Sequence, residues 1–572
     1  MKYNLTTLVK SKISNKNYKK RIFYGYLPTK EKKLLTKSYI FFEKISSISE
    51  KKDNYKKCEE IYNRLLPELS KELNKIHNYH YKKKYWKIVF GRWLFDYISI
   101  VFKNYKYLDL VLKKEKINKI FLKTTDDSLF VTDHPDQLLF KNFSHEWNSD
   151  LNSRILIFLN KKAKLSFFKK SSYRYETKHS PKKNFLKQFF LKLLSFSNKK
   201  NNNYFFFQTG ISFFLEKFIE FKVSGKISRW IMPTLEQNTK IDYDLRKKIN
   251  LNYKSKYKVE DFIKQNIKIA LPKFVIENFK LILLKLKKTT LPTKPKIIFT
   301  TFGVNNVFFN VYAANKILEG SKYVLLQHGN TSLATHYEFK YLAEAKTQDY
   351  FITWGVKKNK NQIPLFNIKS KKNNFSYNQE GNLSIILNNH FSSPRPYDVQ
   401  SERNLLFFNT VSLVNKLEKK VKSKTYFRFF PKDFNNEHEY FKKILKEKNI
   451  NYYSDNFSYK KVLNFSKLTL FNYDSTGFFE NLVNKFPSIY FSKNPLIDLN
   501  QNYKKFYERL IDAKIIFYEE AKLINHIEKV WNNIENWWHN NKTLKAINYF
   551  NNSINIPHEQ NFNKLVKILK KI

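Results

Sequence analysis

The polar residues best suited to chemistry stand where short apolar runs end. The run 468–473 is followed by Asp474–Gly477 (DSTG) and then by a stretch with helical spacing. A helix N-terminus presents unpaired backbone N–H groups and a partial positive charge, so it readily holds a phosphate. The alternative is that the Ser or Thr hydroxyl only caps the helix. The residues expected to bind phosphate are Asp474, Ser475, Thr476, Gly477 and Glu480.

A second polar cluster closes the apolar run Thr425–Phe430. Arg428 and Lys432 supply fixed positive charge, and Asp433 can accept a hydrogen bond from a ribose hydroxyl or a base amine. The alternative is a solvated arginine on the surface of a strand. Because the cluster ends a strand just before a proline turn, it predicts contacts to the charged and polar parts of a nucleotide.

A histidine follows a third apolar run, Tyr323–Gln327. With an ordinary pKa of about 6.5, His328 can take a proton from a hydroxyl near neutral pH. Glu344, downstream, is expected to assist it, and Gln327 and Gly329 to support it. A structural histidine bonded to a loop carbonyl is the alternative.

Several common catalytic motifs are missing from the chain. There is no GxxxxGK[ST] loop, no GxGxxG after a strand, no HExxH, no GxSxG and no Asp-x-Asp element at a strand end. Cys58 is the single cysteine, which excludes an internal disulfide and a cysteine-rich metal site. We therefore expect no metal and no cofactor.

The elements that must position these residues alternate between strand and helix. Strands are predicted at Lys296–Thr301, Tyr323–Gln327 and Asp349–Trp354, a second series begins at Leu383, and Arg154–Leu159 is another candidate strand. Such alternation is typical of α/β folds with parallel sheets. The expected domains are a helical part at 1–125, an α/β domain at 126–356 with a basic insertion near 165–203, a linker at 357–382, a second α/β domain at 383–541 and a helical tail at 542–572.

The charge is extreme, with 106 Lys and Arg against 49 Asp and Glu, a formal net charge of +57. The alternative explanations are nucleic-acid binding, attraction to an anionic membrane surface and AT-rich codon bias. The basic segment Lys182–Asn203 could lie on a membrane as an amphipathic helix, or be a packed helix or an insertion. We find neither a transmembrane segment nor a secretory signal, and expect a cytoplasmic location.

Taken together, the motifs resemble those of the transferases encoded in bacterial O-antigen and other surface-carbohydrate loci. That resemblance implies a GT-B-like fold: two doubly wound Rossmann-like domains facing a cleft, with a helical N-terminal region. The segments that carry it are Asn74–Leu94, His145–Asn148, Gln327–Gly329, Asp349–Gly355, Arg428–Asp433, Asp474–Gly477 with Glu480 and Pro487, and Val530–Trp538.

The C-terminal motifs are also similar to a pair of elements found in teichoic-acid glycerophosphotransferases, capsule Kdo transferases and bacterial sialyltransferases. In those enzymes the pair holds a cytidine nucleotide, so the resemblance favours CMP- or CDP-linked donors. This chain departs from the pattern, because Phe430 precedes Pro431 where the related enzymes have histidine.

The resemblance implies a metal-independent glycosyltransferase of O-antigen, lipopolysaccharide or capsule biosynthesis. Its substrates would be a nucleotide-sugar and a lipid-linked or polysaccharide acceptor, at the inner face of the plasma membrane. Two alternatives from other classes are a basic nucleic-acid-binding protein and a non-catalytic scaffold of polysaccharide assembly. No specific nucleic-acid partner is expected.

Overall fold

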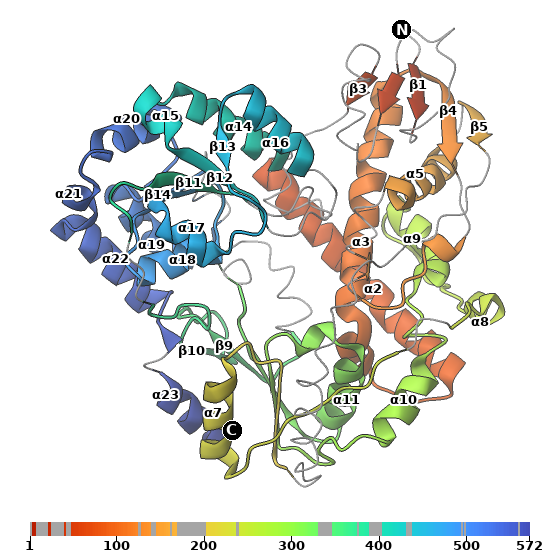
Figure 1. Ribbon diagram of the computed structural model, residues 1–572. Helices are drawn as coiled ribbons and strands as arrows, with labels where there is room; N and C mark the ends of the chain where they lie inside the picture. The colour runs from red at the N-terminus through yellow and green to blue at the C-terminus, as the bar shows by residue number, and fades with distance from the viewer. Residues whose placement is uncertain are drawn as a thin grey trace.

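The described residues of the chain fold into three parallel β-sheets with helices packed around them (Figure 1). In this part of the chain, no helix is long and apolar enough to cross a membrane. The α/β class with parallel sheets, predicted from the alternation of elements, is confirmed. The computed structural model describes residues 3–6, 21–23, 39–41, 47–123, 127–135, 137–138, 145–160, 163–168, 202–235, 239–329, 334, 346–373, 377–387, 403–430, 438–492, 496, 499–558 and 561–572.

The first sheet was not anticipated, because its strands are short and lie far apart in the sequence. Its order is β3-β2-β1-β4-β5, helix α5 packs against β4, and the long helix α3 extends from this sheet toward the second one (Figure 1). The strands are β1 (Tyr3–Thr6), β2 (Arg21–Phe23), β3 (Tyr39–Phe41), β4 (Ile117–Lys123) and β5 (Lys164–Phe168), and the helices are α2 (Ile48–His77), α3 (Lys83–Lys114) and α5 (His145–Leu159).

The helical character expected for the N-terminal region is confirmed by α2 and α3, whose aromatic stripe is buried. The strand expected at Arg154–Leu159 is wrong, because this segment is the second half of α5. Leu151, Ile155 and Leu156 recur at helical spacing and are buried. The Arg154 guanidinium also reaches back one helical turn to the Asp150 carboxylate at 2.9 Å.

The second sheet has its strands in chain order, β10-β9-β8-β7-β6. Its central strands are buried on both faces, which explains their continuous apolar sequences. The segment 357–382, expected as a linker, contributes β10. The strands are β6 (Tyr204–Phe207), β7 (Ile297–Thr300), β8 (Lys322–Leu326), β9 (Tyr350–Thr353) and β10 (Gln362–Pro364), accompanied by α7 (Phe213–Ser224), α8 (Tyr243–Lys247), α9 (Lys258–Ala270), α10 (Phe279–Lys287), η2 (Gly303–Asn305) and α11 (Val307–Leu318).

The third sheet has the order β13-β12-β11-β14-β15-β16, in which the direction of winding reverses between β11 and β14. This is the doubly wound order whose switch point is a preferred ligand site. The strands are β11 (Asn382–Ile386), β12 (Thr425–Arg428), β13 (Asn451–Tyr452), β14 (Ser466–Phe471), β15 (Ser488–Phe491) and β16 (Ile516–Phe517), and the helices are α14 (Arg403–Lys416), α15 (Lys419–Ser423), α16 (His438–Glu447), α17 (Tyr459–Asn464), α18 (Thr476–Val483), α19 (Gln501–Asp512), α20 (Glu520–Val530) and α21 (Ile534–Trp538).

The C-terminal segment is helical and returns to the second sheet. After α22 (Asn541–Ser553), the last helix α23 (Phe562–Lys571) lies beside α7, far from the third sheet that precedes it in the chain (Figure 1). Leu565 and Leu569 of α23 are fully buried in a cluster with Ile219 of α7 and with strand residues of the second sheet. The tail therefore ties the second and third sheets together.

Candidate active site

The second sheet places His328 directly after the carboxyl end of β8. Its imidazole is half-buried and lies against the ring of Phe302, with the ring centroids 5.3 Å apart. Phe302 follows β7, the neighbouring strand, so both aromatic rings belong to the same edge of the sheet. The Lys369 ammonium lies 5.3 Å from the centroid of the same Phe302 ring. A base candidate and a cation therefore share one edge of the second sheet.

The backbone around His328 is held by its neighbour Gln327, which is buried. The Gln327 Oε1 accepts a hydrogen bond from the Trp354 backbone N–H at 3.0 Å, and its Nε2 donates to the Gly329 carbonyl at 3.0 Å. In return the Trp354 indole N–H donates to the Gln327 carbonyl at 2.8 Å. Gln327 thereby joins the ends of β8 and β9 and limits where His328 can lie. Among the described residues, no atom lies within 4 Å of a Cβ added to Gly329.

The third sheet brings the other two sequence clusters to one edge. Arg428 ends β12 and Phe471 ends β14, and both pair with Ile386 of the central strand β11. The side chains after β14 therefore lie two strands from Arg428, on either side of the switch point of this doubly wound sheet. Two clusters that are about 45 residues apart in the sequence thus meet where such sheets bind ligands.

Arg428 is a half-buried cation that lies over the ring of Tyr459, with 5.4 Å between the guanidinium carbon and the ring centroid. Burial lowers the pKa of Arg428, and Tyr459 and Tyr473 oppose that shift. In the part of the chain that the structure describes, no carboxylate pairs with this guanidinium and its Nε has no hydrogen-bond acceptor. A half-buried cation with no paired carboxylate among the described residues is typical of sites that bind an anion.

The helix expected to hold phosphate is present as α18. Its N-cap is Ser475, which is buried and whose Oγ accepts a hydrogen bond from the Gly477 backbone N–H at 3.0 Å. The capping role considered for the hydroxyls is therefore filled by Ser475. Asp474 is held from α19, because its Oδ2 accepts a hydrogen bond from the Tyr507 hydroxyl at 2.8 Å. Thr476 begins the helix and is half-buried.

Glu480 lies one turn into α18, and its charge interacts with side chains from the second and the third sheet. Burial raises the pKa of the Glu480 carboxyl, and the positive charge of Lys369 partly offsets this shift. Lys369 comes from the segment after β10, whereas Tyr459, whose own pKa is affected by the Glu480 charge, begins α17. The Glu480 carboxyl is therefore near enough to Lys369 and to Tyr459 for their charges to affect one another.

Several predicted site residues fall outside the described residues. These are Glu344, Lys432 and Asp433, together with the basic segment Lys182–Asn203 except for its last two residues. Three neighbours were missed by the sequence reading. No local motif marks these residues, which are Phe302, Lys369 and Tyr459. They join the site only because distant segments of the chain come together in the fold.

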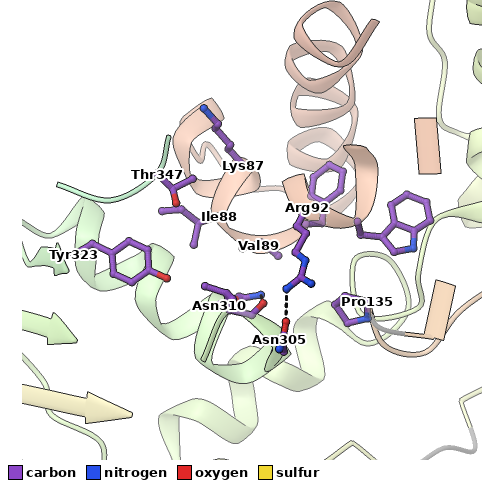
Figure 2. A pocket seen from close by; sticks show the side chains of 12 residues that line it. Lys87, Ile88, Val89, Arg92, Pro135, Asn305, Asn310, Tyr323 and Thr347 are labelled. Carbon is purple, nitrogen blue, oxygen red and sulfur yellow. Dashed lines mark hydrogen bonds between the residues drawn. The ribbon is translucent and has the colours of Figure 1, made fainter. Parts of the chain in front are cut away.

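A small pocket lies between α3 and the start of α11 (Figure 2), and it is lined by residues other than those at the His328 and Arg428 strand ends. Lys87 and Arg92 of α3 line it, and the Arg92 guanidinium donates a hydrogen bond to the Asn305 side chain. None of the predicted site residues lines this pocket, and its aromatic and aliphatic walls belong to the packed helix interface. We give more weight to the strand ends, where the chemistry-bearing side chains converge.

The described residues include no group of three or more His, Cys, Asp or Glu side chains close enough to hold a metal ion. Of the acidic side chains of the site, Asp474 accepts a hydrogen bond from Tyr507. Glu480 interacts electrostatically with Lys369 and Tyr459. The arrangement is thus one of fixed cations, a helix N-terminus and an imidazole.

Comparisons with known proteins agree with a transferase. No sequence match to a curated protein is found. Among solved structures, the chain is similar to WaaG, a glycosyltransferase involved in lipopolysaccharide biosynthesis, with 9% identity, a TM-score of 0.30, and coverage of 51% of this chain and 95% of that one. This likeness is too distant to support an argument by itself. A family model of the LIC12162 family transferases matches residues 4–565, nearly the full length, and the chain belongs to that family.

Proposed function

We propose that this transferase is a GT-B-like glycosyltransferase that moves a sugar from a nucleotide-activated donor to a lipid-linked or glycan acceptor in surface-polysaccharide biosynthesis. One observation supports it most strongly: at the switch point of the third sheet, the half-buried Arg428 cation lies over the ring of Tyr459, whose hydroxyl donates to the Gly477 carbonyl in the first turn of α18 at 3.4 Å. A guanidinium and a helix N-terminus together suit the phosphates of a nucleotide.

The third sheet would bind the donor. Arg428 would contact the phosphate, and the first backbone N–H groups of α18 would face it. Asp474, Ser475, Thr476 and Gly477 would shape this turn, with Lys432 and Asp433 completing the nucleotide site. The cytidine-like motif pattern favours a CMP- or CDP-linked donor.

A raised pKa at Glu480 supports a role near the phosphate. Burial that disfavours the charged form of this carboxyl reduces its repulsion of an anionic donor. Lys369 brings compensating positive charge from the second sheet. Glu480 would therefore help to join donor and acceptor sides of the site.

The second sheet would supply the proton acceptor. In the proposed step the acceptor hydroxyl oxygen bonds to the anomeric carbon as the bond from that carbon to the donor phosphate oxygen breaks. The His328 imidazole takes the hydroxyl proton, and the electron pair of the broken bond leaves with the phosphate. Arg428 stabilises the negative charge that develops there, so the chain's own cations would take the place of a metal ion. Glu344 would assist His328.

A thermal-shift screen against CMP, CDP, UDP and GDP tests the donor site, since a ligand that binds only the folded state raises the melting midpoint. A cytidine nucleotide is expected to give the largest shift. The double variant Ser475→Ala with Thr476→Ala should reduce that shift, and calorimetry should show weaker nucleotide affinity.

Two other outcomes identify the rival functions. Tight binding to random DNA or RNA that falls steeply with salt, without any nucleotide preference, would indicate a nucleic-acid-binding protein. No response to any nucleotide, and none to nucleic acid, would indicate a non-catalytic scaffold.

A further inference from the structure

Helix α7 is apolar on two opposite faces, which is unusual for a helix at the molecular surface. One face packs inward, with Ile219 fully buried against the second sheet and α23. The other face exposes Phe214, Phe218 and Phe221, which follow each other at steps of four and three residues and are 85%, 46% and 53% exposed. Three exposed phenylalanines on a single helical face have no role in the packing of the core.

The apolar surface extends beyond this stripe. Phe213, at the start of α7, is 45% exposed, its ring lies 5.6 Å from that of Phe214, and the Arg229 guanidinium lies over it at 5.4 Å. Ile227 and Ile231, on either side of Arg229, are about half exposed. We call these residues together the α7 patch: Phe213, Phe214, Phe218, Phe221, Ile227 and Ile231. Large apolar side chains exposed together on one helix and the segment that follows it are typical of an interaction site.

Positive charge borders the α7 patch. Lys222 and Lys226 are exposed at its edge, and the Lys222 ammonium lies 5.5 Å from the Phe218 ring centroid. The neighbouring helix α23 exposes a row of lysines on the side away from its buried leucines. These exposed lysines of α23 are Lys564, Lys567, Lys570 and Lys571.

The acidic residues of α7 do not cancel this charge, because both are used internally. Glu216 hydrogen-bonds with the Thr209 hydroxyl and lies near Lys217. Glu220 is fully buried and accepts hydrogen bonds from the Lys217 ammonium at 2.8 Å and the Ser228 backbone N–H at 3.1 Å. Exposed aromatic rings bordered by lysines match the interface of an anionic lipid bilayer, where rings enter the headgroup region and cations meet lipid phosphates.

The patch also begins close to the candidate active site. Gly210, three residues before α7, adopts a φ of 73°, and a Cβ at this position would lie 2.7 Å from the Phe302 ring. Phe302 is the ring that contacts His328. A single tight turn therefore separates the exposed helix from the proposed proton acceptor.

We propose that the α7 patch docks the protein on an anionic bilayer surface. The apolar rings supply the insertion and the lysines of α7 and α23 supply the attraction. Docking in this way places the His328 edge near the membrane, where a lipid-linked acceptor would be met. This last point rests on the proposed function, whereas docking itself does not.

The experiment is co-sedimentation of the full chain with phosphatidylcholine vesicles, with and without phosphatidylglycerol, in the absence of any donor or acceptor. The wild-type protein should bind the anionic vesicles. The triple variant Phe214→Gln, Phe218→Gln and Phe221→Gln should bind them at least about tenfold more weakly, because the inserting groups are lost.

A matched control replaces three exposed aromatics of the third-sheet half, Phe408→Gln, Phe465→Gln and Tyr518→Gln, and should bind as wild type. The variant Lys564→Gln, Lys567→Gln and Lys570→Gln should bind less at about 0.1 M salt, and the difference should shrink at about 1 M salt, where charges are screened. Equal melting midpoints and equal nucleotide affinities show that these variants fold.

Wild-type vesicle binding by the aromatic variant would overturn the proposal, as would equal binding of wild type to neutral and anionic vesicles. Self-association of the wild-type chain that the aromatic variant abolishes, with no vesicle binding, would show that a second copy covers the patch instead. Vesicle binding without nucleotide binding would refute the proposed function and leave the docking surface standing.

Discussion

The carboxyl edges of the second and third sheets present different kinds of surface, although both end in parallel strands. At the second sheet, hydrogen bonds between Gln327 and Trp354 hold the backbone, and the polar group offered is the His328 imidazole. At the third sheet, the groups offered are the Arg428 guanidinium and, two strands away, the capped N-terminus of α18, with Tyr459 in contact with both. One edge is suited to moving a proton and the other to holding negative charge, so the two roles are divided between two scaffolds.

The strongest test of this division is His328→Ala. Transfer should fall by about 10²- to 10⁴-fold, since the proton acceptor is lost, while nucleotide affinity should stay within about twofold. Steady-state rates and calorimetry measure the two effects. The exposed His539→Ala serves as the matched control and should leave both unchanged. Normal turnover in His328→Ala would refute the assignment of the base.

Arg428→Met should weaken nucleotide binding, which His328→Ala is expected to leave nearly unchanged. Loss of a charged contact to phosphate should weaken nucleotide affinity by about 10- to 100-fold, measured by calorimetry. Arg509→Met is the matched control, because its guanidinium also lies over a tyrosine ring, 3.9 Å from the Tyr549 centroid, but on an exposed helix face. Unchanged affinity in Arg428→Met would place the phosphate elsewhere.

A smaller effect separates capping from ligand binding at Ser475. Replacing a capping serine by alanine costs about 1 kcal/mol of unfolding free energy, so Ser475→Ala and Ser47→Ala, which caps α2, should be destabilised alike in urea denaturation. Only Ser475→Ala should also weaken nucleotide binding. Equal nucleotide affinity in both variants would reduce Ser475 to a cap.

The smallest expected effect is a change in how the free energy of unfolding depends on pH when Glu480 is replaced. Burial raises the pKa of Glu480, so the wild-type fold loses stability as pH rises from below about 4.5 through the raised pKa. Glu480→Gln removes this loss. The stability of the variant relative to wild type should therefore increase as pH rises. Urea denaturation between pH 4 and pH 8 measures the trend.

Glu260 provides the opposite case as a control. Burial opposes the shift, but hydrogen bonds from Arg64 at 2.9 and 2.8 Å lower the pKa of Glu260 overall. The ionised Glu260 carboxylate stabilises the fold above the pKa it has in the unfolded chain, and this stabilisation is lost as pH falls. Glu260→Gln should therefore lower the free energy of unfolding most at neutral pH. If both variants follow the same trend with pH, the Glu480 carboxyl is not destabilised by burial.

The strands were predictable because burial on both faces leaves a continuous apolar run. KIIFTT, YVLLQ and DYFITW mark β7, β8 and β9 within one or two residues at each end. The helix after β7 ends close to Gly320, a residue that commonly follows a helix, and the Asn306 side chain caps its start. The run RILIFL was misread because its six apolar and basic residues fit either period, and only the packing of α5 decides between them.

The sequence by itself determined the α/β class, the positions of the buried strands and the three polar clusters at their ends, because local burial patterns and turn residues are written in consecutive positions. Only the tertiary structure decided that Arg428 and α18 share the switch point, that Lys369 comes near enough to Glu480 to affect its pKa, and that α7 keeps a phenylalanine face exposed beside α23. These facts depend on which distant segments become neighbours, and periodicity along the chain holds no information about that.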